Sequence, residues 1–135
     1  MRSQSTPRKK KKILIVDDDM ITLKMLEKIL SSGGYSVIQT TDGNAAILIA
    51  KKEHPNIVIL DITMPSIDGI SVATMLKSDP KTRNTPIILL SSLIEKEISR
   101  AQNAIPGISF LPKPIKQADL IRQISEHLLD NKFQT

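Results

Sequence analysis

Side chains that could do chemistry follow four short apolar runs of this sequence, at the positions where those runs end. They are Asp17, Asp18 and Asp19 after residues 13–16, Asp61 after residues 57–60, Ser91 and Ser92 after residues 87–90, and Lys113 after residues 108–111. If the runs are neighbouring parallel strands, their carboxyl ends meet at one edge of a sheet, which is where open α/β sheets bind ligands. We therefore expect carboxylate, hydroxyl and ammonium groups to meet at one site.

Such a set of groups restricts the chemistry of the site. Carboxylates brought together repel one another and resist ionisation, and a hard divalent cation such as Mg²⁺, which takes oxygen ligands, relieves that conflict. Cation, ammonium and hydrogen-bond donor are also what a transferred phosphoryl group needs, since its transfer depends mostly on positioning and on neutralisation of charge. A carboxylate is the available nucleophile, so the sequence points to an aspartyl-phosphate.

Apolar runs alternate with segments of helical periodicity along the chain. The runs expected to be strands are residues 13–16, 35–39, 57–60, 87–90 and 108–111. Apolar residues at helical spacing predict five helices, among them one over residues 69–78, one marked by Ile94, Ile98, Ala101 and Ile105, and a last one that ends near Asp130. This alternation predicts a parallel sheet, and the short connections favour an open doubly wound sheet with helices on both faces.

Cap and turn residues mark where the helices begin and end. Asp19 and Asp42 are expected to be helix N-caps, since their side chains can accept from the first free N–H groups. Residues 33–34, both glycine, end the first helix, and His54 ends the second because the residue before a proline is pushed out of the helical region. Neither His54 nor His127 falls at the strand-end edge, so we expect neither to be a ligand.

The chain has 135 residues and no cysteine. Its length suits one domain, and the lack of cysteine excludes disulfides, thiolate metal sites and cysteine nucleophiles. The composition fits a reducing compartment, and we expect a cytoplasmic location. No apolar run approaches the ~18 residues of a membrane span. One tyrosine, two phenylalanines and no tryptophan are too few for a base-stacking platform that binds single strands.

The formal charge of +5 is unevenly distributed. Residues 1–12 contain six basic residues and no acidic one, whereas residues 13–135 contain 13 basic and 14 acidic residues. Self-repulsion and polarity predict a disordered basic tail over residues 1–12, ahead of a domain over residues 13–130 and a short tail over residues 131–135. Since no helix-turn-helix or zinc motif accompanies the basic run, we expect no specific nucleic-acid binding.

Four segments carry a resemblance to a known family, and they are ILIVDDD, DITMPSIDG, IILLSS and FLPKP. Their residues, order and register resemble the receiver domain of two-component response regulators, over about residues 12–130. The resemblance implies a flavodoxin-like (βα)5 sandwich, with a five-stranded parallel sheet in the order 2-1-3-4-5. It also suggests a single-domain response regulator, with a piece cut from a longer chain as the alternative that the sequence leaves open.

The resemblance assigns the phosphoacceptor to Asp61. It implies that Asp18 and Asp61 bind Mg²⁺ directly, together with the backbone carbonyl of Thr63, and that Asp17 acts mainly through a water. Lys113 would pair with Asp61 before transfer and with the phosphoryl group afterwards. The Lys113–Pro114 peptide is expected to be cis, as is typical of the family.

The same resemblance assigns a switch to Ser91 and Phe110. Ser91 would swing inward to donate a hydrogen bond to the phosphoryl group, and Phe110 would turn into the vacated space. That movement would change the face made by the fourth helix, the fifth strand and the fifth helix. Serine in place of the commoner threonine keeps the hydroxyl but loses the β-branch, and phenylalanine in place of tyrosine lacks the phenol.

The implied partners are a sensor histidine kinase or a histidine phosphotransfer protein, and an unidentified downstream protein, with the chain a monomer or a phosphorylation-dependent dimer. On this interpretation the chain promotes its own phosphorylation and dephosphorylation but is a signalling module rather than an enzyme. One alternative is a phosphorylation-independent adaptor with the same fold, against which the complete acidic set argues. Another is an aspartyl-phosphate phosphatase, which would need a second aspartate where Thr63 stands.

Overall fold

Five strands and four helices make up the part of the chain that the structure describes. The structure is a computed structural model, and it describes residues 10–92 and 108–133. The elements are β1 (Lys12–Val16), α1 (Met20–Ser32), β2 (Ser36–Thr40), α2 (Gly43–Glu53), β3 (Ile57–Asp61), α3 (Gly69–Ser78), β4 (Ile87–Ser91), β5 (Ile108–Pro112) and α5 (Gln117–Phe133). The helix predicted from Ile94, Ile98, Ala101 and Ile105 lies outside the described residues, as do residues 1–9 of the predicted tail.

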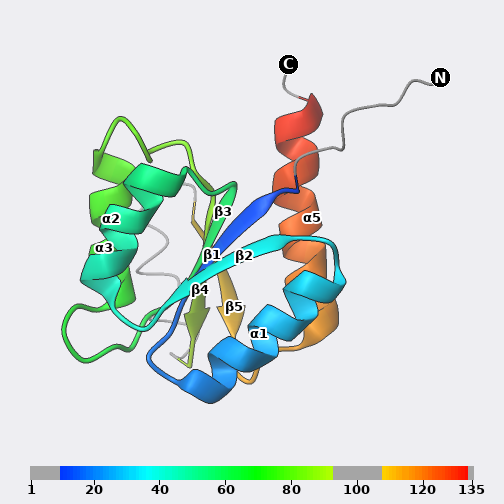
Figure 1. Ribbon diagram of the computed structural model, residues 1–135, viewed down its shortest axis with the longest axis horizontal. Helices are drawn as coiled ribbons and strands as arrows, with labels where there is room; N and C mark the ends of the chain where they lie inside the picture. Colours follow the sequence, from blue (N-terminus) through cyan, green and yellow to red (C-terminus); the bar gives the residue numbers. More distant parts are fainter. Residues whose placement is uncertain (1–9, 93–107, 134–135) are drawn as a thin grey trace.

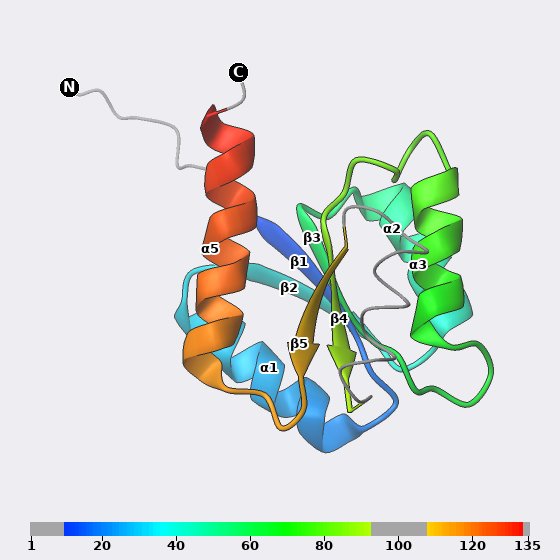
Figure 2. The ribbon, with the colours of Figure 1, turned by 180° about the vertical axis from the view of Figure 1, so that it is seen from behind.

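The strands form one parallel sheet in the order β2-β1-β3-β4-β5 (Figures 1 and 2). The predicted order and the flavodoxin-like fold are therefore confirmed. The strand order changes direction between β1 and β3, which is where such sheets bind their ligands. Val16 of β1 pairs with Leu60 of β3, so that Asp17 and Asp61 follow paired residues on neighbouring strands.

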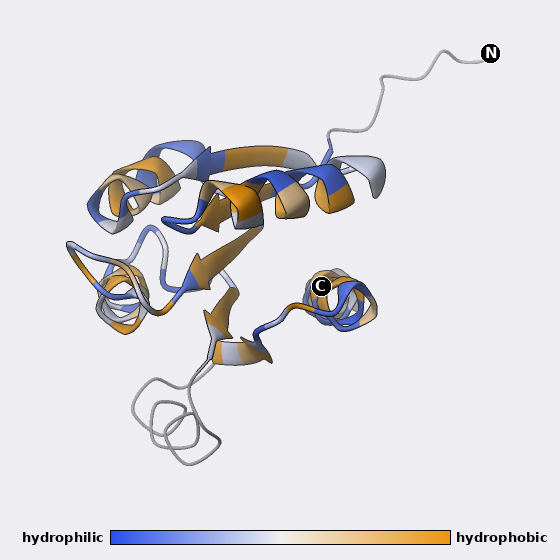
Figure 3. Cartoon of the chain, turned by 90° about the horizontal axis from the view of Figure 1, so that it is seen from below, coloured by the Kyte–Doolittle hydropathy of each residue, from blue (hydrophilic) through white to orange (hydrophobic). Residues whose placement is uncertain are grey.

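Helices cover both faces of the sheet, and alternate strand residues pack against each layer. Leu23 and Leu26 of α1 and Leu120 and Ile124 of α5 belong to one apolar group, which we call the α1–α5 cluster. The other group, the α2–α3 cluster, joins α2 and α3 to the opposite face of the strands. Figure 3 shows the apolar strands lying between these helices. Burial on both faces is the reason that the strands read as continuous apolar runs.

Three of the helices have an aspartate as the N-cap residue. The side chains of Asp19 and Asp42 accept from backbone N–H groups in the first turns of α1 and α2, as predicted. Asp68 does the same for α3, with its Oδ1 2.8 Å from the N–H of Ser71. At the other end of α2, His54 takes a left-handed conformation with φ 49°, which ends the helix where the sequence predicts.

The first strand begins one residue earlier than predicted, because Lys12 belongs to β1 and not to the basic tail. Its N–H donates to Oδ1 of Asn56 at 2.8 Å, and its carbonyl accepts from the N–H of Asn56 at 2.7 Å. Its ammonium pairs with Glu53 of α2 at 3.2 Å. At the other end of the chain, α5 continues to Phe133, past the predicted end near Asp130. No helix in the described ranges is both long and apolar enough to cross a membrane.

Candidate functional site

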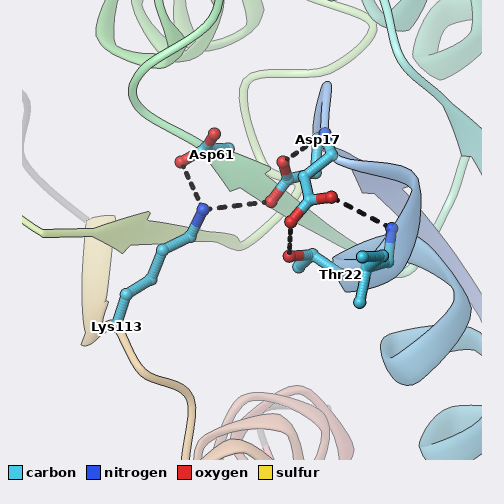
Figure 4. A network of polar contacts seen from close by, with 6 residues as sticks. Asp17, Thr22, Asp61 and Lys113 are labelled. Carbon is cyan, nitrogen blue, oxygen red and sulfur yellow. Dashed lines mark hydrogen bonds and ion pairs between the residues drawn. The ribbon is translucent and has the colours of Figure 1, made fainter.

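Strand ends deliver Asp17, Asp61 and Lys113 to one edge of the sheet, as the sequence pattern predicts (Figure 4). Asp17 directly follows β1, and Asp61 is the last residue of β3. Lys113 follows β5, on the far side of β4, and its side chain extends back toward the two aspartates. Three strands that are distant in the sequence thus contribute one charged group each to the same site.

The carboxylate of Asp17 is fully buried and is held at both oxygens. Oδ1 accepts from the N–H of Asp19 at 2.9 Å, and Oδ2 accepts from the Lys113 ammonium at 3.2 Å. Asp19 uses its own side chain to cap α1, with its Oδ1 3.1 Å from the N–H of Ile21 and its Oδ2 2.9 Å from the hydroxyl of Thr22. The capping role predicted for Asp19 is therefore confirmed, and its backbone supports Asp17.

Lys113 joins the two buried carboxylates, since its ammonium also lies 3.1 Å from Oδ1 of Asp61. The pKa of Asp61 lies above its ordinary value, because burial and the charge of Asp17 oppose ionisation more strongly than Lys113 favours it. Burial lowers the pKa of Lys113, but the contacts with Asp61 and Asp17 outweigh it and leave this pKa above its ordinary value. Lys113 is thus a fixed positive charge beside a carboxylate that resists ionisation.

Asp18 completes an acidic group that is suited to a divalent cation. One carboxylate oxygen each from Asp17, Asp18 and Asp61 lies within 4.8 Å of the others, and Asp18 is exposed while the other two are buried. Three carboxylates and one ammonium leave a formal charge of −2, which a divalent cation would balance. Because every ligand atom is a hard oxygen and one side faces solvent, the residues fit Mg²⁺ with retained waters.

The loop from β3 to α3 returns to the acceptor strand at Gly69. The N–H of Gly69 donates to the carbonyl of Ile62 at 2.7 Å. A Cβ at this position would lie against the carbonyl oxygen of Asp61 and 2.8 Å from Cα of Ile62, so only glycine permits the approach. The sequence showed Gly69 only as part of a motif, because close backbone approach leaves no trace in side-chain periodicity.

The remaining predicted residues lie around this group in different settings. Ser91 is buried at the end of β4, and its carbonyl accepts from the N–H of Lys113 at 2.8 Å. Phe110 in β5 is half-buried and packs against the α2–α3 cluster. Thr63 is exposed, two residues after Asp61. The Lys113–Pro114 peptide is cis, as the resemblance implied.

The sequence is similar to those of known proteins. Residues 13–125 match the family described as "Response regulator receiver domain". The chain is 37% identical over 109 residues to the response regulator PleD of Caulobacter vibrioides, an alignment that covers 80% of this chain and 24% of PleD. It is 28% identical over 114 residues to the polar-differentiation response regulator DivK of Brucella ovis, with 84% of this chain and 93% of DivK covered. The chain thus spans about a quarter of PleD and most of DivK.

Solved structures share the fold. The signal receiver domain of a signal transduction histidine kinase from Syntrophus aciditrophicus has a TM-score of 0.84 and 28% identity, covering 93% of this chain and 95% of that one. The receiver domain of the sensor histidine kinase PA1611 from Pseudomonas aeruginosa, solved with a magnesium ion coordinated in its active site cleft, has a TM-score of 0.77 and 28% identity, covering 87% and 97%. The strand order, the strand-end acids and the match over residues 13–125 together show that the chain belongs to the response regulator receiver family of two-component signalling.

Proposed function

We propose that Asp61 accepts a phosphoryl group from a phosphohistidine, and that the chain passes on a two-component signal in this way. The observation that carries the proposal is the position of the Asp61 carboxylate, 3.1 Å from the Lys113 ammonium and grouped with the carboxylates of Asp17 and Asp18. This group supplies what phosphoryl transfer needs, namely a nucleophile, a fixed positive charge and oxygen ligands for a metal ion.

In the transfer, a carboxylate oxygen of Asp61 attacks phosphorus and the P–N bond of the phosphohistidine breaks. The electron pair of that bond stays on the imidazole nitrogen of the donor, and Asp61 becomes an acyl phosphate. Lys113 is paired with Asp61 beforehand and donates to a phosphoryl oxygen afterwards. Asp18, Asp61 and the carbonyl of Thr63, with Asp17 acting mainly through a water, would hold Mg²⁺, which neutralises phosphoryl charge when bound.

Two residues near the acceptor are suited to report the transfer. Ser91 ends the strand beside β3 and is buried at the same edge, so its hydroxyl would donate to the new phosphoryl group. Phe110 is half-buried on the next strand, and an inward turn of its ring would change the surface around β5 and α5. A local change of charge would in this way bias an element that has two arrangements.

The proposed phosphoryl donor is a sensor histidine kinase or a histidine phosphotransfer protein, because each carries a phosphohistidine. The proposed receiver of the signal is a downstream protein that distinguishes the two arrangements of the β5–α5 surface. We propose that the chain itself acts as a monomer or as a phosphorylation-dependent dimer, with chromatography before and after phosphorylation as the measurement.

Phosphorylation with acetyl phosphate and Mg²⁺, followed by mass spectrometry of the intact protein, tests the proposal. We expect the wild-type chain to gain one phosphoryl group, and Asp61→Asn, which keeps the shape of the side chain, to gain none. Asp42→Asn alters an exposed cap of α2 and is the matched control, which should react like the wild type. Reaction of Asp61→Asn, or no reaction of the wild type with either acetyl phosphate or a phosphorylated histidine kinase, would refute the proposal.

A further inference from the structure

The last strand of the sheet, β5, has a side with no strand partner among the described residues (Figure 2). The N–H of Lys113 donates to the carbonyl of Ser91 in β4. Because backbone groups of successive strand residues face alternate sides, Leu111 also faces β4, and Phe110 and Pro112 face the open side. Pro112 has no N–H to leave unpaired there, but the carbonyl of Phe110 needs a hydrogen-bond partner.

Helix α5 supplies that partner. Nε2 of Gln123 donates to the carbonyl oxygen of Phe110 at 2.9 Å. One turn further along α5, Nε2 of His127 lies 2.9 Å from Oγ of Ser109, within hydrogen-bond distance. Two consecutive residues of β5 are therefore attached to two successive turns of α5.

The contact made by Gln123 connects the two layers of helices. The ring of Phe110 packs against the α2–α3 cluster, whereas Leu120 and Ile124 of α5 pack in the α1–α5 cluster on the opposite face. Gln123 thus reaches from one layer, around the open edge of the sheet, to the backbone of a residue whose ring lies in the other layer. A shift of the β5 backbone at Phe110 would reach α5 directly by this route.

The amide of Gln123 contributes position more than stability. Its Oε1 is buried and has no hydrogen-bond partner in the described part of the chain. A buried acceptor without a partner costs at least as much free energy as one neutral hydrogen bond contributes, so the amide adds no net stability. What the amide fixes is the location of α5 relative to the carbonyl of Phe110.

We propose that Gln123 is a positioning residue that couples Phe110 to α5. The inference rests on the proposed function, in which Phe110 changes position after Asp61 is phosphorylated. As the ring turns inward, the backbone of β5 adjusts at Phe110, and the carbonyl of Phe110 carries the amide of Gln123 with it, so that α5 shifts against the sheet. The outer face of α5, on which Ile121 is exposed, is thereby presented differently to a partner in the two states.

The test follows backbone amide NMR signals of the whole chain before and after phosphorylation, with acetyl phosphate in excess and Mg²⁺ present. Mass spectrometry first establishes phosphoryl incorporation, so failure of the proposed function is seen separately from failure of this coupling. In the wild type we expect signals of both β5 and α5 to move. In Gln123→Met, which has similar length but cannot donate, we expect the same incorporation, the same movement in β5, and loss of most of the movement in α5.

A second variant and a control complete the experiment. Gln123→Leu also removes the amide and can neither donate nor accept a hydrogen bond, so it should lose the α5 movement as well. Arg122→Ala changes an exposed neighbour on α5 that pairs with Glu126, and it should respond like the wild type. Undiminished α5 movement in both Gln123 variants, or no α5 movement in the phosphorylated wild type, would overturn the inference.

Discussion

Ionisation of Asp61 is opposed by its surroundings, and this has a consequence for stability. Burial and the charge of Asp17 raise the pKa of Asp61 above the ordinary 3.8, in spite of the attraction of Lys113. The folded chain therefore holds a proton on Asp61 more tightly than the unfolded chain does. It follows that stability is lost as the pH rises from the unfolded pKa through the higher folded pKa.

Replacement of the carboxylate by a neutral amide should remove that loss. We expect Asp61→Asn, with chelator present, to be more stable than the wild type at neutral pH, and the difference to shrink as the pH falls through the folded pKa of Asp61. Unfolding by denaturant at a series of pH values measures this, with the exposed Glu126→Gln as control. A difference between Asp61→Asn and the wild type that stays constant with pH would contradict the assignment.

Glycine at position 69 is required by the backbone of the acceptor strand. The methyl group of Gly69→Ala would lie against the carbonyl of Asp61, so we expect a loss of about 1–3 kcal/mol in unfolding free energy, as for other overpacked sites. Displacement of Asp61 should also slow its reaction with acetyl phosphate. Gly33→Ala, whose new methyl group would meet nothing closer than 3.4 Å, is the control in both assays. Equal stability of Gly69→Ala and the wild type would mean that the loop adapts without cost.

Sequence reasoning located most of the charged site residues because strand ends converge. Once strands 13–16, 57–60 and 108–111 are recognised as parallel, Asp17, Asp61 and Lys113 must lie at one edge. The sequence predicted an ion pair between Lys113 and Asp61, but it did not predict that Lys113 also pairs with Asp17. Gly69 and Gln123 were not singled out, because their roles depend on contacts with backbone atoms of distant residues.

At the scale of elements, α1 places apolar side chains next to the acidic site. The helix begins two residues after Asp18, and its first residues Met20 and Ile21 are 56% and 78% exposed. We expect a protein that delivers a phosphoryl group to Asp61 to contact this turn, because the turn continues directly from the acidic residues. Burial of these side chains against the donor would favour the complex.

Truncation of Ile21 should therefore distinguish a protein donor from a small one. We expect Ile21→Ala to slow phosphorylation by a phosphorylated histidine kinase roughly 5- to 10-fold, since loss of this buried area costs about 1–1.4 kcal/mol. Its reaction with acetyl phosphate should not change. Leu48→Ala, at a side chain 69% exposed on α2, is the matched control and should leave both rates unchanged. Equal slowing with both donors would place the effect at the acceptor itself, and unchanged rates would exclude contact at this turn.

The presence of each helix and strand was easier to predict than the residue at which it begins. Periodicity indicated the helices, and burial on both faces made the strands visible as apolar runs. The start of β1 was missed because the inclusion of Lys12 depends on hydrogen bonds to Asn56, which is 44 residues away. The second strand likewise begins at Ser36 and not at Tyr35, since the N–H of Ser36 pairs with the carbonyl of Lys11.

At the scale of the whole molecule, the basic segment of residues 1–12 leads into the first residue of β1, and the acidic site follows the last residue of the same strand. Residues 1–12 contain six of the 19 basic residues, and they join the sheet at Lys12, the first residue of β1. Asp17 follows the last residue of the same strand, about 17 Å away at about 3.3 Å per residue. This separation exceeds the screening length of about 8 Å at physiological salt but not the length of about 30 Å at 0.01 M.

The salt concentration should therefore determine whether the basic segment changes the affinity of the acidic site for Mg²⁺. Removal of residues 2–10 deletes four positive charges but keeps Lys11 and Lys12, whose backbone groups pair with Ser36 and Asn56. We expect this deletion to tighten Mg²⁺ binding in 0.01 M salt, because positive charge repels the cation, and to change nothing at physiological salt. Calorimetric titration with Mg²⁺ at both salt concentrations measures this, and Lys9→Arg with Lys10→Arg keeps the charge as the control. A deletion effect that persists at physiological salt would show that the basic segment acts on the site at close range.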